Sequence, residues 1–234
     1  ISWGQLPQNR LYAVFPAGRQ VGTPFDVNVT SSADSEELSE LVFDHQGLKA
    51  VAKTRDENGQ MVPIPNQFSV TVAADVPPGL YEIRSRGLYG LSNPRTFAVG
   101  ATLEVQEAEP NQFSEQAQEV APGTIVNGKV NGGADVDWFK FSGQAGQTFV
   151  AQIWGKRLDS RLDGTIELFA PSGQRLAIAR NTVRQDPLLI HTLPSDGEYR
   201  LKVYDFVYGG GEEYFYRLDL NQRPFIESIQ PAAA

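Results

Sequence analysis

Two segments say most about this chain: Glu107-Ala-Glu-Pro-Asn-Gln-Phe-Ser-Glu-Gln-Ala117 and, further along, Gly133-Ala-Asp-Val-Asp-Trp-Phe-Lys-Phe141. The first is acidic and is interrupted by Pro110. The second places two aspartates directly before an aromatic, strand-like run. Together they indicate a β-sandwich module of an exported protein, and they hold the one plausible cation site of the sequence.

The bulk composition is that of a folded, turn-rich protein. A length of 234 residues fits one large or two ordinary domains. Hydrophobic residues make up 41% and charged residues 21%, which allows a packed core. The 22 glycines and 15 prolines are a surplus that favours many short strands joined by tight turns.

Charge and residue inventory exclude several classes of protein. A net charge of −8 and a pI near 4.8 argue against a nucleic-acid partner, because little would neutralise phosphates. The absence of cysteine excludes disulfides, zinc–thiolate sites and a thiol nucleophile. No run approaches the roughly 18 apolar residues of a membrane span, so no membrane insertion is expected.

Strand-like runs dominate the first half of the chain. Most are bounded by Gly, Pro, Asn or Asp, and their rhythm is that of an immunoglobulin-like sandwich. The predicted strands are Leu11–Phe15, Pro24–Thr30, Glu40–Asp44, Leu48–Thr54, Gln67–Val72, Gly79–Ser85 and Thr96–Val99.

Turn and core residues in this half carry a family resemblance. Pro77-Pro-Gly-Leu-Tyr-Glu-Ile83 is followed by Gly90-Leu-Ser-Asn-Pro-Arg-Thr-Phe97, and an earlier match is Val14-Phe-Pro-Ala-Gly-Arg-Gln-Val-Gly-Thr23. Over residues 10–99 these motifs resemble IPT/TIG domains. The resemblance implies an immunoglobulin-like domain of IPT/TIG type over residues 1–100.

The second half begins after a joint at Gly100–Gln106. A helical turn is predicted over Asn111–Glu119, with Asn111 as its N-cap and Glu115 near the positive end of its dipole. Ala170-Pro-Ser-Gly173 predicts a hairpin. The predicted strands are Gly123–Val130, Val136–Ser142, Thr148–Trp154, Gly164–Ala170, Arg175–Ile178, Pro187–Leu193, Gly197–Tyr204 and Tyr214–Leu220.

A longer series of motifs runs through this half. They are Glu107-Ala-Glu-Pro-Asn111, Val126-Asn-Gly128, Asp135-Val-Asp-Trp-Phe139, Ala145-Gly-Gln147, Leu162-Asp163, Leu168-Phe-Ala-Pro-Ser-Gly173, Pro194-Ser-Asp-Gly-Glu-Tyr199 and Tyr214-Phe-Tyr-Arg-Leu218. In this order they resemble the bacterial pre-peptidase C-terminal (PPC) domain. The resemblance implies a jelly-roll-like β-sandwich over residues 101–222, a non-catalytic module of secreted bacterial proteins such as proteases and collagenases. The whole chain is thus expected to be all-β, with two tandem β-sandwiches.

The end of the chain echoes its beginning. Arg223-Pro-Phe-Ile-Glu-Ser-Ile-Gln-Pro-Ala-Ala233 resembles Arg10-Leu-Tyr-Ala-Val-Phe-Pro-Ala17. Residues 223–234 are therefore expected to be a linker or the first strand of a further, truncated module. Because the chain starts at Ile1 and shows no signal peptide, we interpret it as a segment of a longer protein.

The acidic residues of the two opening segments predict a cation site. Residues two apart in an extended segment share a face, about 6.5 Å apart, so Glu107 and Glu109 are expected to project together, as are Asp135 and Asp137. Four converging carboxylates would repel one another unless a cation or water separated them. Carboxylate and amide oxygens are the ligands that Ca²⁺ takes.

The family resemblance makes this prediction more specific. In the collagenase modules that this half resembles, calcium binds through the corresponding acidic segment and Asp-x-aromatic region. Carried over by position, this implies calcium ligands at Glu107, Glu109, Asn111 and Asp137, with Asp135 as a neighbour. Those modules offer a carboxylate where this chain has Gln112, which predicts weaker binding. The alternative is that the two glutamates are solvated linker charges and that Asp137 caps a turn.

Catalysis within the chain is not expected. The two histidines, His45 and His191, stand apart, and neither lies near a nucleophile elbow or a His-Glu-x-x-His motif. The spacing of the 28 acidic residues singles out no carboxylate pair. The chain is therefore predicted not to be an enzyme.

Aromatic residues are numerous in the second half. Alternation puts Tyr214 and Tyr216 on one face and Phe215 on the other, so some of these residues must be core. Any that remain outside could stack on sugar or peptide, and Tyr204 and Tyr208 are the candidate ligand-binding residues.

The leading interpretation is a non-catalytic accessory segment of a larger bacterial protein, acting as spacer and as adhesion or substrate-targeting module. Its expected location is exported: periplasmic, cell-surface or extracellular. Its expected partners are an extracellular polymer, protein or polysaccharide, or neighbouring domains of the same chain. Two alternatives stay open: a carbohydrate-binding module that uses exposed aromatics, and a non-catalytic fragment of a secreted hydrolase.

Overall fold

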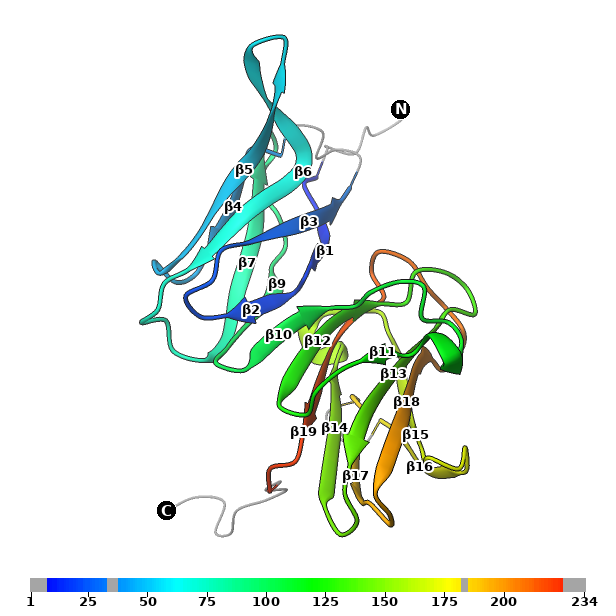
Figure 1. Cartoon of the computed structure of the whole chain (residues 1–234). Helices are drawn as coiled ribbons and strands as arrows, with labels where there is room; N and C mark the ends of the chain where they lie inside the picture. Colours follow the sequence, from blue (N-terminus) through cyan, green and yellow to red (C-terminus); the bar gives the residue numbers. More distant parts are fainter. Residues whose placement is uncertain (1–7, 33–37, 182–184, 225–234) are drawn as a thin grey trace.

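The structure is a computed structural model, and it describes residues 8–32, 38–181 and 185–224. These residues form four β-sheets, stacked in pairs as two sandwiches that follow one another along the chain (Figure 1). Within these ranges there is no α-helix, and the helical turns are two short 3-10 segments, η2 (Ser114–Gln116) and η3 (Lys156–Leu158). The all-β expectation is confirmed.

The first sandwich is built from residues 11–100. One sheet has the strand order β1-β3-β6-β5 and the other β2-β9-β7-β4, with β8 paired to β7. Phe68, Ile83 and Phe97 are fully buried between the two sheets. The strands are β1 (Leu11–Phe15), β2 (Gly18–Gln20), β3 (Phe25–Ser31), β4 (Glu40–Phe43), β5 (Leu48–Glu57), β6 (Gln60–Val72), β7 (Gly79–Gly87), β8 (Gly90–Leu91) and β9 (Arg95–Gly100).

The β5–β6 hairpin is longer than the sequence predicts. It continues beyond the sandwich as a two-stranded ribbon that turns at Asn58 and Gly59, both with positive φ (Figure 1). Asn-Gly in this conformation suits a tight hairpin turn. The predicted strand begins at Gln67, seven residues after the start of β6, because the outer half of β6 contains Pro63 and Pro65, which are unfavourable in strands.

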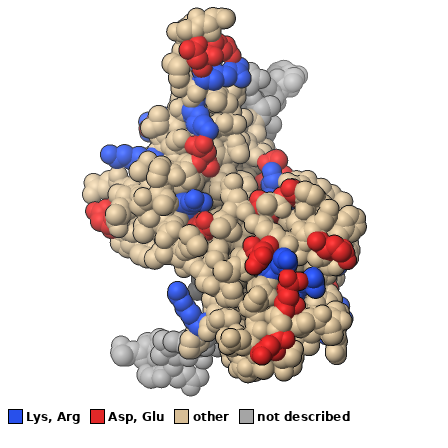
Figure 2. Space-filling model, in the orientation of Figure 1, with Lys and Arg blue, Asp and Glu red and all other residues tan. Residues whose placement is uncertain are grey.

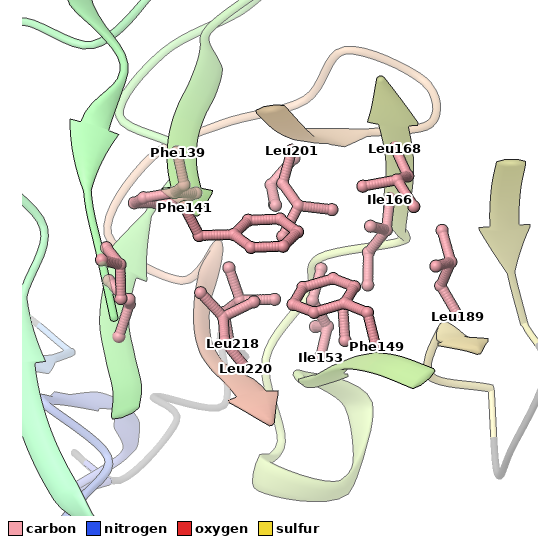
Figure 3. Packing of buried hydrophobic residues seen from close by; sticks show 14 of the residues in the cluster. Phe139, Phe141, Phe149, Ile153, Ile166, Leu168, Leu189, Leu201, Leu218 and Leu220 are labelled. Carbon is pink, nitrogen blue, oxygen red and sulfur yellow. The ribbon is translucent and has the colours of Figure 1, made fainter. Parts of the chain in front are cut away.

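The second sandwich is built from residues 103–221. Its sheets have the orders β10-β12-β19-β14-β17 and β11-β13-β18-β15-β16. Phe141 from one sheet stacks on Phe149 from the other, with ring centroids 4.0 Å apart, at the centre of the core (Figure 3). The strands are β10 (Leu103–Gln106), β11 (Gln118–Glu119), β12 (Thr124–Lys129), β13 (Val136–Gly143), β14 (Thr148–Trp154), β15 (Gly164–Phe169), β16 (Arg175–Arg180), β17 (Leu188–Thr192), β18 (Gly197–Asp205) and β19 (Phe215–Asn221).

The predicted joint contains a strand of its own. β10 runs parallel to β12, so the connection between the sandwiches is an edge strand of the second one. Glu104 of β10 is buried and forms a two-pronged ion pair with Arg217 of β19, at 2.6 and 3.0 Å. Asn127 of β12 completes the network by donating to Glu104 and accepting from Arg217. The connection is therefore held along its length by the second sandwich.

The two sandwiches also touch directly. Asp159, at the end of η3, accepts hydrogen bonds from the backbone N–H and the hydroxyl of Thr96 in β9. Gly18 comes so close to Arg217 that a Cβ there would lie 2.5 Å from its Nη1. A small apolar cluster fills the interface, formed by Ala13, Ala17, Ala98, Leu158 and Phe215. These contacts fix the orientation of one sandwich relative to the other.

One expectation about local structure needs correction, and another falls mainly outside the described residues. The helical turn predicted over Asn111–Glu119 is reduced to the 3-10 turn Ser114–Gln116, which Phe113 precedes as N-cap. Asn111 is not the cap because its side chain is buried elsewhere, as described below. The predicted extra strand falls mainly on residues 225–234, which the structure does not describe.

The face drawn in Figure 2 carries charges of both signs. On the face drawn in Figure 2, acidic and basic side chains form small mixed groups, and neither sign makes an extended patch. Among the described residues, no helix has the length and apolar character needed to cross a membrane.

Candidate metal centre

The acidic segment crosses from one sheet of the second sandwich to the other. It leaves β10 at Gln106 and reaches β11 at Gln118, and β11 pairs with β13 in the opposite sheet. Glu107, Glu109 and Asn111 lie on this crossing. Asp137, near the start of β13, lies beneath it, and one ligand atom from each of Glu107, Glu109 and Asp137 falls within 4.8 Å of the others.

A single tyrosine hydroxyl joins two of these carboxylates. Tyr216 of β19 lies 2.6 Å from Asp137 Oδ2 and 3.0 Å from Glu107 Oε1. Because a hydroxyl has one proton to donate, it cannot satisfy both acceptors fully. The pair therefore needs a further positive charge, either a proton on one carboxyl group or a cation.

Two buried oxygens at this position have no hydrogen-bond partner. Asn111 and Asp137 are both 0% exposed, and Asn111 Oδ1 and Asp137 Oδ1 accept nothing. The other Asn111 atoms are used, since Nδ2 donates to Glu107 Oε1 and the carbonyl accepts from Trp138 N–H. Buried polar atoms are rarely left without partners, so these two oxygens are available to a bound ion or a water molecule.

Glu109 is the exposed member of the cluster. Its Oε1 accepts from Asn131 Nδ2 at 2.7 Å, and its Oε2 accepts from Gln112 Nε2 at 2.8 Å and from Asn111 N–H. Gln112 thus faces the site, but it presents an amide donor to Glu109 where a carboxylate would add negative charge.

Asp135 is not part of the cluster, contrary to the pairing expected with Asp137. Its two oxygens accept from the backbone N–H groups of Asn131 and Val136. Asp135 and Asp137 do not share a face of one extended segment, because β13 begins at Val136 and Asp135 belongs to the preceding turn. The structure brings Glu107, Glu109, Asn111 and Asp137 together and leaves Asp135 beside them.

Burial sets the electrostatics of the site. Desolvation, together with the charge of the adjacent Glu107, raises the pKa of Asp137 to about 10. Desolvation also raises the pKa of Glu107. The backbone N–H of Lys129 donates to Glu107, but the ammonium group of Lys129 is paired with Glu212. Without a cation, Asp137 therefore holds a proton at neutral pH.

This protonation predicts how stability depends on pH when no cation is present. The pKa of Asp137 is higher in the folded state than the roughly 3.9 of an unfolded aspartate. Its stabilising contribution is therefore complete below about pH 4 and is lost as the pH rises toward about 10. Urea unfolding in EDTA, followed by the fluorescence of Trp138 and Trp154, should show decreasing stability from pH 5 to pH 9. A flat or rising profile would contradict the assignment.

The donor set fits a hard cation. Three carboxylates converge, the amide of Asn111 is bonded to one of them, and no described ammonium or guanidinium group is ion-paired with any of the three. Oxygen ligands of this kind suit Ca²⁺, with water completing the six to eight ligands it takes. Bound calcium would give Asp137 Oδ1 and Asn111 Oδ1 the partner that they lack.

Comparisons with known proteins give partial similarities. No protein-family model matches the chain. Over 105 residues, or 42% of the chain, it is 31% identical to a probable subtilase-type serine protease of Deinococcus radiodurans. The match spans 14% of that protease, so most of the relative has no counterpart here.

Two solved structures are similar to part of this chain. The pre-peptidase C-terminal domain of a collagenase from Bacillus anthracis matches along 100% of its length and covers 49% of this chain, with a TM-score of 0.39 and 18% identity. PliG, a periplasmic inhibitor of g-type lysozyme from Aeromonas hydrophila, matches along 95% of its length and covers 51% of this chain, with a TM-score of 0.34 and 22% identity. The resemblance of residues 10–99 to IPT/TIG domains stays a prediction.

The structure adds residues that the sequence did not point to. Tyr216 comes from the last strand, 109 positions after Glu107, and alternation alone marked it only as a core or surface tyrosine. Asn131 was missed because a turn asparagine carries no distinguishing signal.

The candidate ligand-binding tyrosines differ in exposure. Tyr204 is 8% exposed and donates its hydroxyl to Glu167, whereas Tyr208 is 52% exposed and stacks on the Tyr204 ring. Of the two, Tyr208 presents the accessible ring.

Proposed function

We propose that this chain is a non-catalytic accessory segment of a larger exported protein, in which calcium stiffens the second sandwich and its connection to the first. The observation that carries the proposal is the pair of buried, unpartnered oxygens at Asn111 and Asp137 inside a cluster of three carboxylates. It is expected to hold a neighbouring part of the same protein and to target that part to an extracellular polymer.

Glu107, Glu109, Asn111 and Asp137 would hold the ion. The first three lie on the crossing segment and the last on β13, so the ion would tie the crossing to the sheet beneath it. Because β10 leads directly into this segment, the same tie would steady the connection to the first sandwich. The buried Glu104–Arg217 pair already anchors β10, so calcium is expected to add stiffness rather than to create the joint.

Thermal unfolding of the full chain tests this proposal. Adding 10 mM calcium to a sample freed of metal with EDTA should raise the melting temperature, since a ligand that binds only the folded state stabilises it by mass action. Magnesium is the matched control, because it demands a smaller, more regular oxygen shell and should give a much smaller rise. An unchanged melting temperature in calcium would overturn the proposal.

Gln112 offers a way to strengthen the site. Replacing it with glutamate removes the amide that donates to Glu109 and adds a fourth negative charge facing the cluster. Calcium affinity should rise roughly tenfold, which is about 1.4 kcal/mol. Titration calorimetry measures this, with Gln116→Glu as the control, because it adds the same charge to the exposed side of the same segment. Equal effects of both variants would mean that only net charge matters.

Sugar binding by exposed aromatics is a second candidate function. Phe206, Val207 and Tyr208 form an exposed apolar loop, and Tyr208 stacks on Tyr204. Aromatic rings presented in this way are suited to stacking on the apolar face of a sugar. Affinity electrophoresis in gels containing neutral glucans tests this, since Tyr208→Ala should abolish any retardation of the wild type. No retardation of the wild type would remove this candidate.

A further inference from the structure

The first sandwich carries a cleft that is separate from both the calcium centre and Tyr208. It has a volume of about 600 Å³ and lies among the start of β1, the β7–β8 hairpin and the turn into β9. This volume is within the usual range for small-ligand sites. Its main side chains are Arg10, Tyr12, Tyr89, Asn93 and Arg95.

The cleft is positive in a negative protein. The chain carries a net charge of −8, yet the nine described residues that line the cleft include two arginines and no acidic residue. Other described arginines are mostly paired, as Arg86 is with Glu40, whereas Arg10 and Arg95 form no ion pair with a described carboxylate. Each uses only part of its five donors, Arg10 on Gln8 and Arg95 on the Leu11 carbonyl. The remaining donors suit an anionic ligand.

Two tyrosines are placed beside these arginines by irregular backbone. In the pairing of β1 with β3, Leu11 lies opposite Ser31 and Ala13 opposite Thr30, so Tyr12 is the extra residue of a β-bulge. Bulges redirect the side chain that they carry. Tyr89 lies at the turn of the β7–β8 hairpin and is 50% exposed. Tyr12 is half-buried, and the two tyrosine rings give the cleft apolar surface on which a sugar ring can stack.

Asn93 occupies backbone groups that an added peptide strand would need. Its side-chain amide accepts from the backbone N–H of Leu11 and donates to the carbonyl of the same residue, as a neighbouring strand would. Addition of a strand from a partner needs free backbone groups at such an edge. The backbone N–H and carbonyl of Leu11, at the start of β1, are therefore not available to a partner strand. This favours a ligand that side chains recognise.

We propose that this cleft binds a polysaccharide whose sugar units carry carboxylate groups. Arg10 and Arg95 pair with the carboxylates, because a guanidinium group matches a carboxylate in two-pronged geometry. Tyr12 and Tyr89 stack on the sugar rings. This inference rests on the targeting role in the proposed function and names the class of polymer, but it does not require the calcium centre, which lies in the other sandwich.

Affinity electrophoresis of the full chain in gels containing polygalacturonate tests this inference. EDTA is present throughout, so that the result does not depend on calcium. Polygalacturonate should retard the wild type, and Arg10→Gln and Tyr89→Ala should each weaken the retardation at least tenfold. Both substituted residues are exposed, and unchanged melting temperatures would show that the variants fold. Arg55→Gln, which lies on β5 away from the cleft, should behave as the wild type.

Three outcomes would overturn the inference. One is the absence of retardation by polygalacturonate. Another is equal retardation of the wild type and of both cleft variants. The third is equal binding to neutral hydroxyethylcellulose or to poly-glutamate, which would indicate a neutral glycan or an acidic peptide as the ligand. None of these changes the expected effect of calcium on melting temperature, so the two proposals fail separately.

Discussion

Replacing Asp137 with asparagine should stabilise the calcium-free protein and abolish its response to calcium. In the absence of a cation the folded wild type must keep a proton on Asp137 that the unfolded chain releases above about pH 4. Asparagine is neutral without taking up a proton, and its side chain has the same shape as that of aspartic acid. It also offers an amide donor toward Glu107, in place of the proton that Asp137 holds.

The expected change is large. At pH 8 the gain in the calcium-free state should be on the order of 2 kcal/mol or more, a rise in melting temperature of roughly 5 °C or more. In 10 mM calcium the order should reverse, because the variant has lost an anionic ligand. The matched control is Asp135→Asn, since Asp135 binds backbone N–H groups of its own turn and should leave the calcium response intact. A variant at Asp137 that melts lower in EDTA, or still responds to calcium, would contradict this assignment.

Replacing Glu104 with glutamine should cause a large loss of stability. Glu104 and Arg217 are both buried, so the variant leaves a guanidinium charge without a counter-charge. Breaking a buried pair in this way costs roughly 3–5 kcal/mol. The loss should loosen β10 and with it the connection between the sandwiches, since Glu104 lies on that strand.

Thermal unfolding and small-angle scattering measure the two effects. The melting temperature should fall by roughly 10 °C, and the scattering curve should show a wider distribution of shapes. Glu40→Gln is the matched control, because its ion pair with Arg86 is half-exposed and worth less than about 1 kcal/mol. The double variant Glu104→Met with Arg217→Met should recover most of the stability, since it removes both charges. Equal losses in the single and double variants would show that packing, not charge, is responsible.

The sequence predicts the regular parts of this fold well. Thr148–Trp154 is a strand with those bounds in the structure, and it places Phe149, Ala151 and Ile153 in the core. Tyr214, Phe215 and Tyr216 also follow the expected alternation, since Phe215 packs at the interface between the sandwiches and Tyr216 packs in the core of the second. Such elements are predictable because local burial determines them.

Other features depend on distant partners and could not be predicted. β10 and β11 are short and pair in parallel with strands that come later in the chain, so their own residues give little strand signal. Asp159 looks like an ordinary turn residue, yet its carboxylate binds Thr96 of the first sandwich. The candidate metal site was predictable at Glu107, Glu109, Asn111 and Asp137, but Tyr216 joins it only through the sheet.

Titration calorimetry of the full chain, freed of metal with EDTA and then exchanged into buffer at pH 8, is the most direct test of the calcium centre. We expect calcium to bind at one site with a dissociation constant of roughly 10⁻⁵–10⁻³ M. We also expect binding to release about one proton, because calcium displaces the proton held by Asp137. Repeating the titration in buffers of different ionisation enthalpy measures that proton. The absence of saturable binding, or binding without proton release, would contradict the assignment of Asp137 as a calcium ligand.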